Sequence, residues 1–159
     1  MKTIPLTRGY FTKVDDEDYE KFASIRWQAM VDSRSKMVRA SRKGGNPRTT
    51  IYLSREIMNA PKGKLVDHVN GNQLDNQKQN LRLCTHAENL QNRGPTKSNT
   101  SGFKGVCFDK NLKKWRAQIG FKMKRRYIGS FNTKKEAALA YDRFTRKLHG
   151  KFAKPNLLI

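Results

Sequence analysis

Residues 65–72 read LVDHVNGN, residues 80–83 read NLRL, and residues 88–89 read EN. The apolar start of the first piece predicts a short strand over 64–69, and the alternating leucines of the second predict another over 81–84. Asn, Gln and Gly are frequent in residues 70–80, which predicts a polar loop between the strands. A T-x-x-E capping box at 85–88 opens a helix that runs to about residue 93. This part of the chain therefore reads as strand, loop, strand and helix.

The residues before this segment predict a small, sheet-rich module. Apolar runs separated by turn residues indicate two short strands within 1–15. Four consecutive acids at 15–18 precede a short helix, because acidic side chains stabilise the positive end of a helix. Further elements are expected as strands over 27–31, 36–41 and 49–53 and as a short helix between Ser54 and Pro61. No catalytic constellation is evident in this module.

The residues after 93 predict a linker and a second module. Residues 94–101 read GPTKSNTS, a composition typical of a flexible linker. A second capping box at 133–136 opens a helix that Gly150 would end. Three strands precede it, over 103–108, 115–121 and 125–131. Helical spacing predicts that its buried face comprises Ala137, Ala140, Tyr141, Phe144 and Leu148.

The chain of 159 residues is strongly basic, and its charge is unevenly distributed. It has 34 Lys and Arg against 13 Asp and Glu, a net charge of +21. Residues 94–159 carry 17 basic and 3 acidic side chains, a net charge of +14, whereas residues 64–93 are almost neutral at +1. Such an excess repels itself unless a polyanion is near, so DNA or RNA is the expected partner. A nearly neutral segment suits a site that holds a metal ion between carboxylate and amide ligands.

Composition excludes several other classes of protein. No apolar run approaches the ~20 residues that cross a bilayer, and the N-terminus lacks the apolar core of a signal peptide. The two cysteines, Cys84 and Cys107, form no C-x-x-C pair, which argues against a disulfide framework and a thiolate zinc site. We therefore expect a soluble, cytoplasmic protein with no membrane partner and no obligate protein partner.

The central segment carries the pattern D-H-x-N-G-x-x-x-D-N, then N-L-R, then N, with His68, Asn80 and Asn89 spaced by 12 and 9 positions. This pattern resembles the HNH endonucleases, specifically the phage and intron homing type. The resemblance implies that His68 is the general base and that Asp67 and Asn89 bind a divalent metal ion. It also implies that Asn80 holds the loop and positions His68. In a regular strand Asp67 and His68 would face opposite sides, so a shared site requires the strand to end or twist there.

The chemistry of these residue types agrees with the resemblance. A neutral imidazole accepts a proton from water near pH 7. Magnesium prefers oxygen ligands, here a carboxylate and an amide carbonyl, with waters and a phosphate oxygen completing the set. Mn²⁺ accepts the same donors and should replace Mg²⁺. We therefore expect metal-dependent hydrolysis of phosphodiester bonds at a preferred site in double-stranded DNA.

The C-terminal module carries GFKGV at 102–106, KWRAQI at 114–119 and IGSF at 128–131. These motifs resemble the ethylene-response-factor (Apetala-two) DNA-binding domain, which implies a three-stranded sheet that lies in the major groove and a helix that braces it. The implied DNA-binding residues are Lys104, Arg116, Gln118, Lys122, Lys124, Arg125 and Arg126. Trp115 either stacks against DNA or packs in the sheet, and the sequence leaves both open. Residues 107–109 depart from the plant pattern, so the plant target sequence is not carried over.

The expected fold class is α+β, in four parts. Residues 1–63 form a sheet-rich module that contacts DNA, residues 64–93 the ββα-metal HNH unit, residues 94–101 a linker, and residues 102–159 a three-stranded antiparallel sheet packed on one helix. A non-catalytic, sequence-specific DNA-binding regulator is the alternative function. The intact set of four site residues favours the enzyme, because a regulator has no need of them. RNA binding is less favoured, since no exposed aromatic platform is evident.

Overall fold

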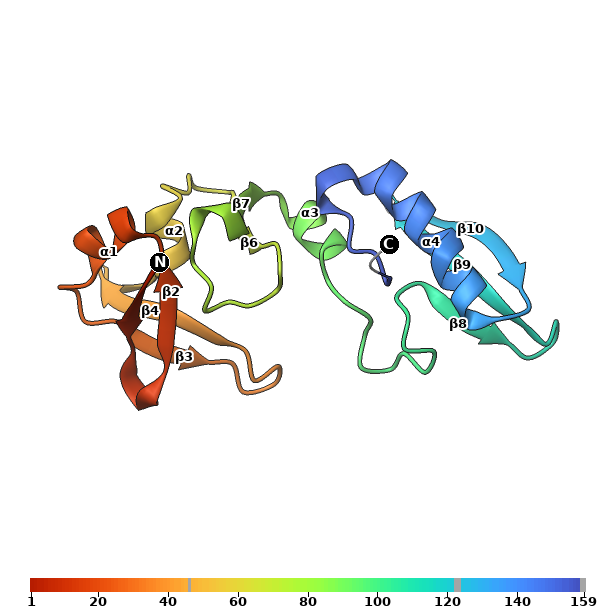
Figure 1. The fold of residues 1–159 in the computed structure, drawn as a ribbon, viewed down its shortest axis with the longest axis horizontal. Coiled ribbons are helices and arrows are strands. Elements are labelled where there is room, and N and C mark those ends of the chain that lie inside the picture. Colours follow the sequence, from red (N-terminus) through yellow and green to blue (C-terminus); the bar gives the residue numbers. More distant parts are fainter. Residues whose placement is uncertain (46, 122–123, 158–159) are drawn as a thin grey trace. The chain divides into compact units, whose positions relative to one another are not determined.

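The structure is a computed structural model that describes residues 1–45, 47–121 and 124–157. Its elements form two compact units, Met1–Asn89 and Leu90–Ile159. Both units mix small antiparallel sheets with helices (Figure 1), which confirms the α+β class. None of the helices in these described ranges is long and apolar enough to cross a membrane.

The described residues of the first unit form three small antiparallel sheets (Figure 1). The first sheet pairs β1 (Lys2–Pro5) with β2 (Phe11–Val14), and the second has the order β3 (Gln28–Val31), β4 (Val38–Gly44) and β5 (Thr49–Tyr52). The third pairs β6 (Leu65–His68) with β7 (Leu81–Cys84). The helices are α1 (Asp16–Phe22), α2 (Leu53–Ile57) and α3 (His86–Gln91), the last of which ends just beyond the unit boundary.

One hydrophobic core serves the whole of this unit. Its buried residues come from all three sheets and from α2, and they include Ile4, Val14, Trp27, Leu53 and Leu81. Burying a side chain of this size contributes roughly 1.5–3 kcal/mol. The β6–β7 ribbon is too small to form such a core by itself, so it is stabilised by the sheets that precede it in the chain.

The second unit is a three-stranded antiparallel sheet with one long helix on it. The sheet order is β10 (Lys124–Phe131), β9 (Lys114–Phe121) and β8 (Val106–Asp109), and α4 (Lys134–His149) lies across one face (Figure 1). The predicted capping box is present, since the Glu136 amide donates to the Thr133 hydroxyl and the Thr133 amide donates to the Glu136 carboxylate. The helix is followed by Gly150, whose φ of 50° suits glycine.

The predicted buried face of α4 is partly wrong. Phe144 is 44% exposed, whereas Asp142 and Thr145 are fully buried. The prediction assumed that a polar residue is exposed, but Asp142 is buried and accepts hydrogen bonds there. Its carboxylate accepts from the backbone amides of Asn156 (2.7 Å) and Leu157 (2.8 Å) and so binds the C-terminal segment to the helix.

Candidate active site and DNA-binding face

The strand β6, which carries Asp67 and His68, ends at His68, as a shared site for these two residues requires. Asp67 and His68 are the last two residues of β6 and lie opposite Arg82 and Leu81 of β7. The amide of Gly71 then donates to the carbonyl of His68 at 2.9 Å, and Gly71 adopts a φ of 82°, which turns the chain away from the ribbon. Both side chains remain close to the end of the ribbon and both are buried.

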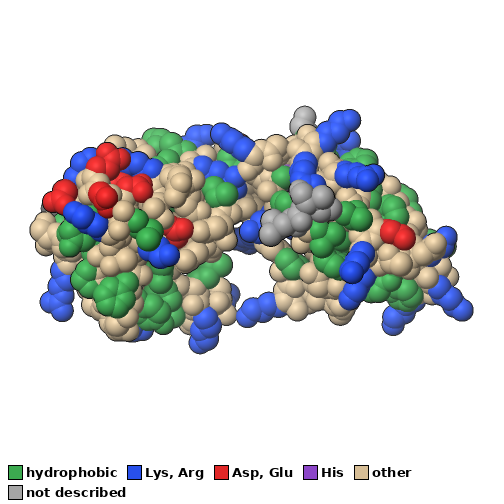
Figure 2. Space-filling model, viewed as in Figure 1, with side chains coloured by type: hydrophobic (Ala, Val, Ile, Leu, Met, Phe, Trp, Pro, Cys, Tyr) green, Lys and Arg blue, Asp and Glu red, His purple; other side chains and the backbone are tan. Residues whose placement is uncertain are grey.

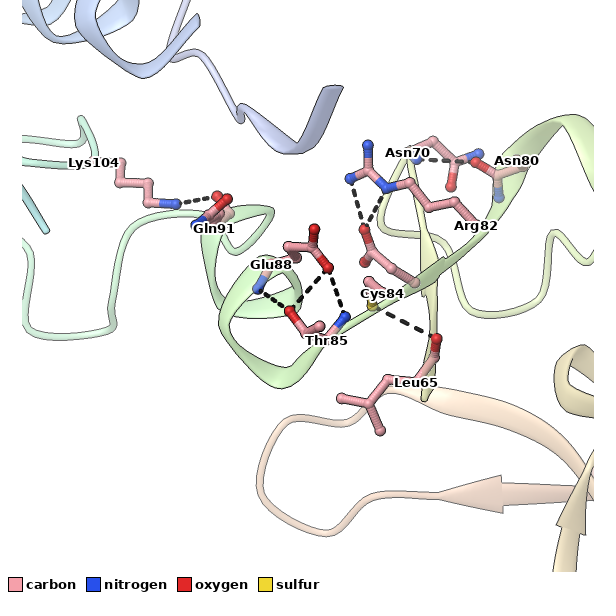
Figure 3. Close-up of polar contacts among 10 residues, drawn as sticks. Leu65, Asn70, Asn80, Arg82, Cys84, Thr85, Glu88, Gln91 and Lys104 are labelled. Carbon is pink, nitrogen blue, oxygen red and sulfur yellow. Dashed lines mark hydrogen bonds and ion pairs between the residues drawn. The ribbon is translucent and has the colours of Figure 1, made fainter. Parts of the chain in front are cut away.

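Asp67 forms an ion pair that the sequence did not predict. The Nε and Nη2 atoms of Arg82 donate to Asp67 Oδ2 at 2.8 and 2.6 Å (Figure 3), and the two side chains are only 13% and 7% exposed. A buried carboxylate requires a partner of this kind because its charge is poorly solvated. Arg82 therefore balances the charge of the predicted metal ligand.

His68 is 3% exposed, and its Nε2 atom lies 3.0 Å from the Oδ1 atom of Asn76. Burial is the main cause that lowers the pKa of His68 below its usual value, and the positive charge of Arg39 adds to that effect. The hydrogen bond to Asn76 and the negative charges of Asp67 and Asp75 act in the opposite direction. The net effect keeps the imidazole neutral near pH 7, the form that a general base requires.

Asn80 lies at the base of the loop, at the end of a short 3₁₀ turn (Lys78–Asn80) and directly before β7. Its side-chain Oδ1 accepts from the Asn70 amide at 3.0 Å (Figure 3), and its Nδ2 donates to the Asp75 carbonyl at 2.7 Å. Its backbone carbonyl accepts from the Val69 amide at 2.9 Å. These contacts close the loop between the two strands directly after His68.

Asn89 lies on α3, which follows β7 after a single capping residue, Thr85. The predicted capping box is present, with the Glu88 carboxylate accepting from the Thr85 amide at 2.7 Å (Figure 3). Asn89 is half-buried.

In the described part of the chain, no group of three or more His, Cys, Asp and Glu residues gathers as a metal site. Carboxylate and amide oxygens, the groups that Asp67 and Asn89 carry, are ligand types that a hard cation accepts.

The C-terminal sheet presents one open face. In β9, Ala117 and Ile119 point toward α4, so Arg116 and Gln118 point away from it. The strand register places Arg125 beside Gly120 on this same open face. The open face of this sheet therefore carries three of the residues that the sequence assigned to DNA binding.

Arg116 is held in place on the open face by two neighbours. Its Nη1 atom lies 3.4 Å from the Asp109 carboxylate of β8, and its guanidinium lies 5.4 Å from the ring centre of Tyr127. Tyr127 is 59% exposed and donates its hydroxyl to Ser130 at 2.9 Å. An exposed guanidinium with restricted freedom is suited to bidentate contacts with guanine. Sequence reasoning did not identify the contribution of Tyr127.

Three of the other predicted DNA-binding residues, Lys104, Lys124 and Arg126, do not lie on this face. Lys124 and Arg126 lie opposite Phe121 and Ile119 in the register, on the side toward α4, and Arg126 lies over the ring of Phe121. Lys104 is half-buried and donates from Nζ to the carbonyl of Gln91 at 2.5 Å (Figure 3). Lys122 lies outside the described residues. The alternation of side chains along β10 thus separates Lys124 and Arg126 from Arg125, and partial burial sets Lys104 apart from the other predicted DNA-binding residues.

Trp115 packs in the sheet, which answers the question that the sequence left open. It contacts the core of this unit and meets Phe108 edge to face at 5.2 Å between ring centres. On the face drawn in Figure 2, Lys and Arg side chains are spread over both units, while most of the acidic side chains gather over α1.

Comparison with known proteins finds two domains in this chain. A family model described as HNH endonuclease matches residues 59–91, and one described as AP2 domain matches residues 101–151. The chain is therefore a DNA-binding, nuclease-type protein that joins an HNH endonuclease domain to an AP2 domain.

Two viral relatives extend the comparison. The chain belongs to the same family as Protein 3.8 of Escherichia phage T7, to which it is 39% identical over 94 residues, 59% of this chain and 77% of that protein. It is also 33% identical to an uncharacterized HNH endonuclease of Acanthamoeba polyphaga mimivirus over 107 residues, 67% of this chain and 53% of that protein. The chain thus spans about half the length of the mimivirus relative. No solved structure matches the chain.

Proposed function

We propose that this protein is a metal-dependent HNH endonuclease of the homing type that hydrolyses phosphodiester bonds at a preferred site in double-stranded DNA. The observation that carries the proposal is the arrangement of Asp67 and His68 at the end of β6, with Asn80 closing the loop beside them and Asn89 on the following helix. The matches to HNH and AP2 models support it.

In the proposed reaction, His68 takes a proton from the attacking water, and its lowered pKa keeps it in the accepting form. Asp67 and Asn89 would hold the divalent ion, Mg²⁺ or Mn²⁺. When bound, this ion would neutralise charge on the phosphate and on the leaving oxygen. Asn80 keeps the loop closed behind His68.

Cleavage of supercoiled plasmid in the presence of Mg²⁺ tests the catalytic assignment. We expect His68→Ala to lower the rate by about 10²–10⁴-fold, the usual contribution of a general base, with little loss of DNA affinity. The matched control is His86→Ala, since His86 is exposed in α3 of the same unit. Asp67→Ala, Asn89→Ala and chelation by EDTA should each suppress cleavage. Full activity of His68→Ala, or cleavage that persists in EDTA, would contradict the mechanism.

Binding and site preference are proposed to reside mainly in the C-terminal unit, because residues 94–159 carry +14 of the net charge of +21. The open face with Arg116, Gln118 and Arg125 is the proposed base-reading surface. The N-terminal sheets would add a second, weaker contact. A regulator that only binds DNA is the second candidate, and the same open face supports it. The plasmid assay separates the two functions, since a regulator would bind without nicking or cutting.

A truncation tests this division of labour. A fragment that ends at Arg93 lacks 17 of the 34 basic side chains and should bind DNA weakly, with little preference among sequences. Its salt dependence should also flatten, by about 0.9 in the log–log slope for each phosphate that the fragment no longer neutralises. Titrations on specific and random duplexes at two salt concentrations measure both quantities. A fragment that retained full affinity and the full slope would refute the assignment.

A further inference from the structure

A chain of buried hydrogen bonds connects the N-terminal hairpin to His68. The hydroxyl of Thr12, in β2, donates to the carbonyl of Leu74 at 2.9 Å. The Nδ2 atom of Asn76 donates to the Thr12 hydroxyl oxygen at 2.7 Å, and the Oδ1 atom of Asn76 lies 3.0 Å from Nε2 of His68. Thr12, Asn76 and His68 are 0%, 1% and 3% exposed, so water does not compete for these bonds.

The direction of every bond in this chain follows from its first acceptor. The Leu74 carbonyl can only accept, so the single hydrogen of the Thr12 hydroxyl points to it. The Thr12 oxygen must then accept from Asn76, which places the amide NH₂ toward Thr12 and the amide oxygen toward His68. The opposite amide orientation would turn the hydroxyl hydrogen away from Leu74 and leave the Thr12 and Leu74 oxygens facing each other at 2.9 Å with no proton between them. Because an amide oxygen only accepts, Nε2 of His68 must carry a hydrogen.

We propose that Thr12 and Asn76 are positioning residues that hold His68 in the tautomer with hydrogen on Nε2, so that Nδ1 is the atom that accepts the proton from water. The proposal rests on the proposed function, in which His68 is the general base. It identifies the accepting atom and two residues that set it, one of which lies outside the segment that matches the HNH model.

The same hairpin also holds the loop that carries Asn76. The amide of Lys13 donates to the Leu74 carbonyl at 2.8 Å, and the amide of Asn76 donates to the Lys13 carbonyl at 2.9 Å. Asn76 is thus fixed by its backbone as well as by its side chain, and its amide group cannot follow a rotating imidazole. The N-terminal hairpin is therefore part of the catalytic unit as well as a scaffold for the sheets.

The test combines nitrogen NMR of the full chain labelled on the His68 imidazole with the plasmid assay. In the wild type we expect a protonated-type resonance for Nε2 and an unprotonated-type resonance for Nδ1. Thr12→Val is close in shape but removes the acceptor for Asn76, so the amide can rotate and both tautomers should appear. Cleavage should fall by about 10–100-fold, the usual effect of losing a partner that orients a functional histidine. The control is Thr12→Ser, which keeps the hydroxyl and should restore both the single tautomer and the rate.

A wild type with hydrogen on Nδ1 would overturn the proposal, and this measurement requires no variant to fold. A Thr12→Val protein that keeps one tautomer and the full rate would overturn the positioning role. If the wild type has hydrogen on Nε2 but His68→Ala cleaves as well as the wild type, the proposed role of His68 as the general base fails while the hydrogen-bond chain stands. The two hypotheses are therefore distinguishable.

Discussion

Replacing Gly105 by alanine should disrupt the C-terminal unit more than the same change at a nearby glycine. Gly105 precedes β8 with a φ of 75°, and its carbonyl accepts from the Gln118 amide at 2.9 Å. A Cβ atom at this position would lie 2.2 Å from Cε2 and 2.3 Å from Cδ2 of Tyr141, and 2.6 Å from the Gln118 carbonyl oxygen. Tyr141 is 2% exposed, so its ring has little room to move.

Two costs add at this position. A left-handed backbone costs a residue with a Cβ atom about 1–2 kcal/mol. Forcing an extra carbon into a packed core costs typically about 1–3 kcal/mol more. Gly102→Ala is the matched control, because Gly102 has a φ of 80° but no atom within 4 Å of the added Cβ. We therefore expect Gly105→Ala to lower the free energy of unfolding of this unit by about 2–5 kcal/mol, and Gly102→Ala by only about 1–2 kcal/mol.

Amide hydrogen exchange of the full chain, followed by mass spectrometry, measures this difference. Peptides from α4 report the opening free energy of the C-terminal unit, and peptides from β1 and β2 provide an internal reference that should not change. Loss of the sheet should also weaken DNA binding, since the proposed base-reading surface is built on it. Equal protection of α4 in the Gly105→Ala and Gly102→Ala proteins would refute the steric argument, because only the close approach to Tyr141 and Gln118 distinguishes them.

Two further predictions concern the same unit. Arg116→Ala and Arg125→Ala should each weaken binding to the preferred site by about 1–3 kcal/mol relative to random DNA. Arg126→Ala should weaken binding to preferred and random DNA equally, because Arg126 lies on the side toward α4. Titrations on both duplexes measure this, and a larger loss of preference from Arg126→Ala would show that the assigned base-reading face is wrong. Burial, aided by the charge of Lys154, lowers the pKa of Lys104 from 10.5 to about 8, so the folded state binds this proton more weakly than the unfolded state does. Stability of the unit should therefore rise between about pH 8 and pH 10.5, and Lys104→Met should lack this rise in denaturation curves measured at both ends of that range.

The sequence by itself determined the elements that form through contacts between residues close together in the sequence. The capping boxes at 85–88 and 133–136 and the turn-rich loop at 70–80 lie where the patterns predict them. A cap joins groups three positions apart, so its residues are adjacent in any conformation of the chain that is locally helical. The D-H, N and N pattern likewise identified the HNH segment, and family comparison matches it there. The roles of its individual residues stay predictions.

Only the tertiary structure decided which distant residues share an environment. Thr12 meets Asn76 across 64 positions because one core joins the N-terminal hairpin to the β6–β7 ribbon, and no local pattern encodes that contact. Because side chains alternate along β10, Arg125 and Arg126 lie on opposite faces of the sheet. Which of them faces away from α4 became known only from the register with β9, which places Arg125 beside Gly120. Asp142 was missed for a related reason, since its polarity favours exposure until the C-terminal segment returns to hydrogen-bond with it. Local patterns specify strands and caps through groups a few residues apart, whereas core packing sets which of these elements meet and which side chains they bury.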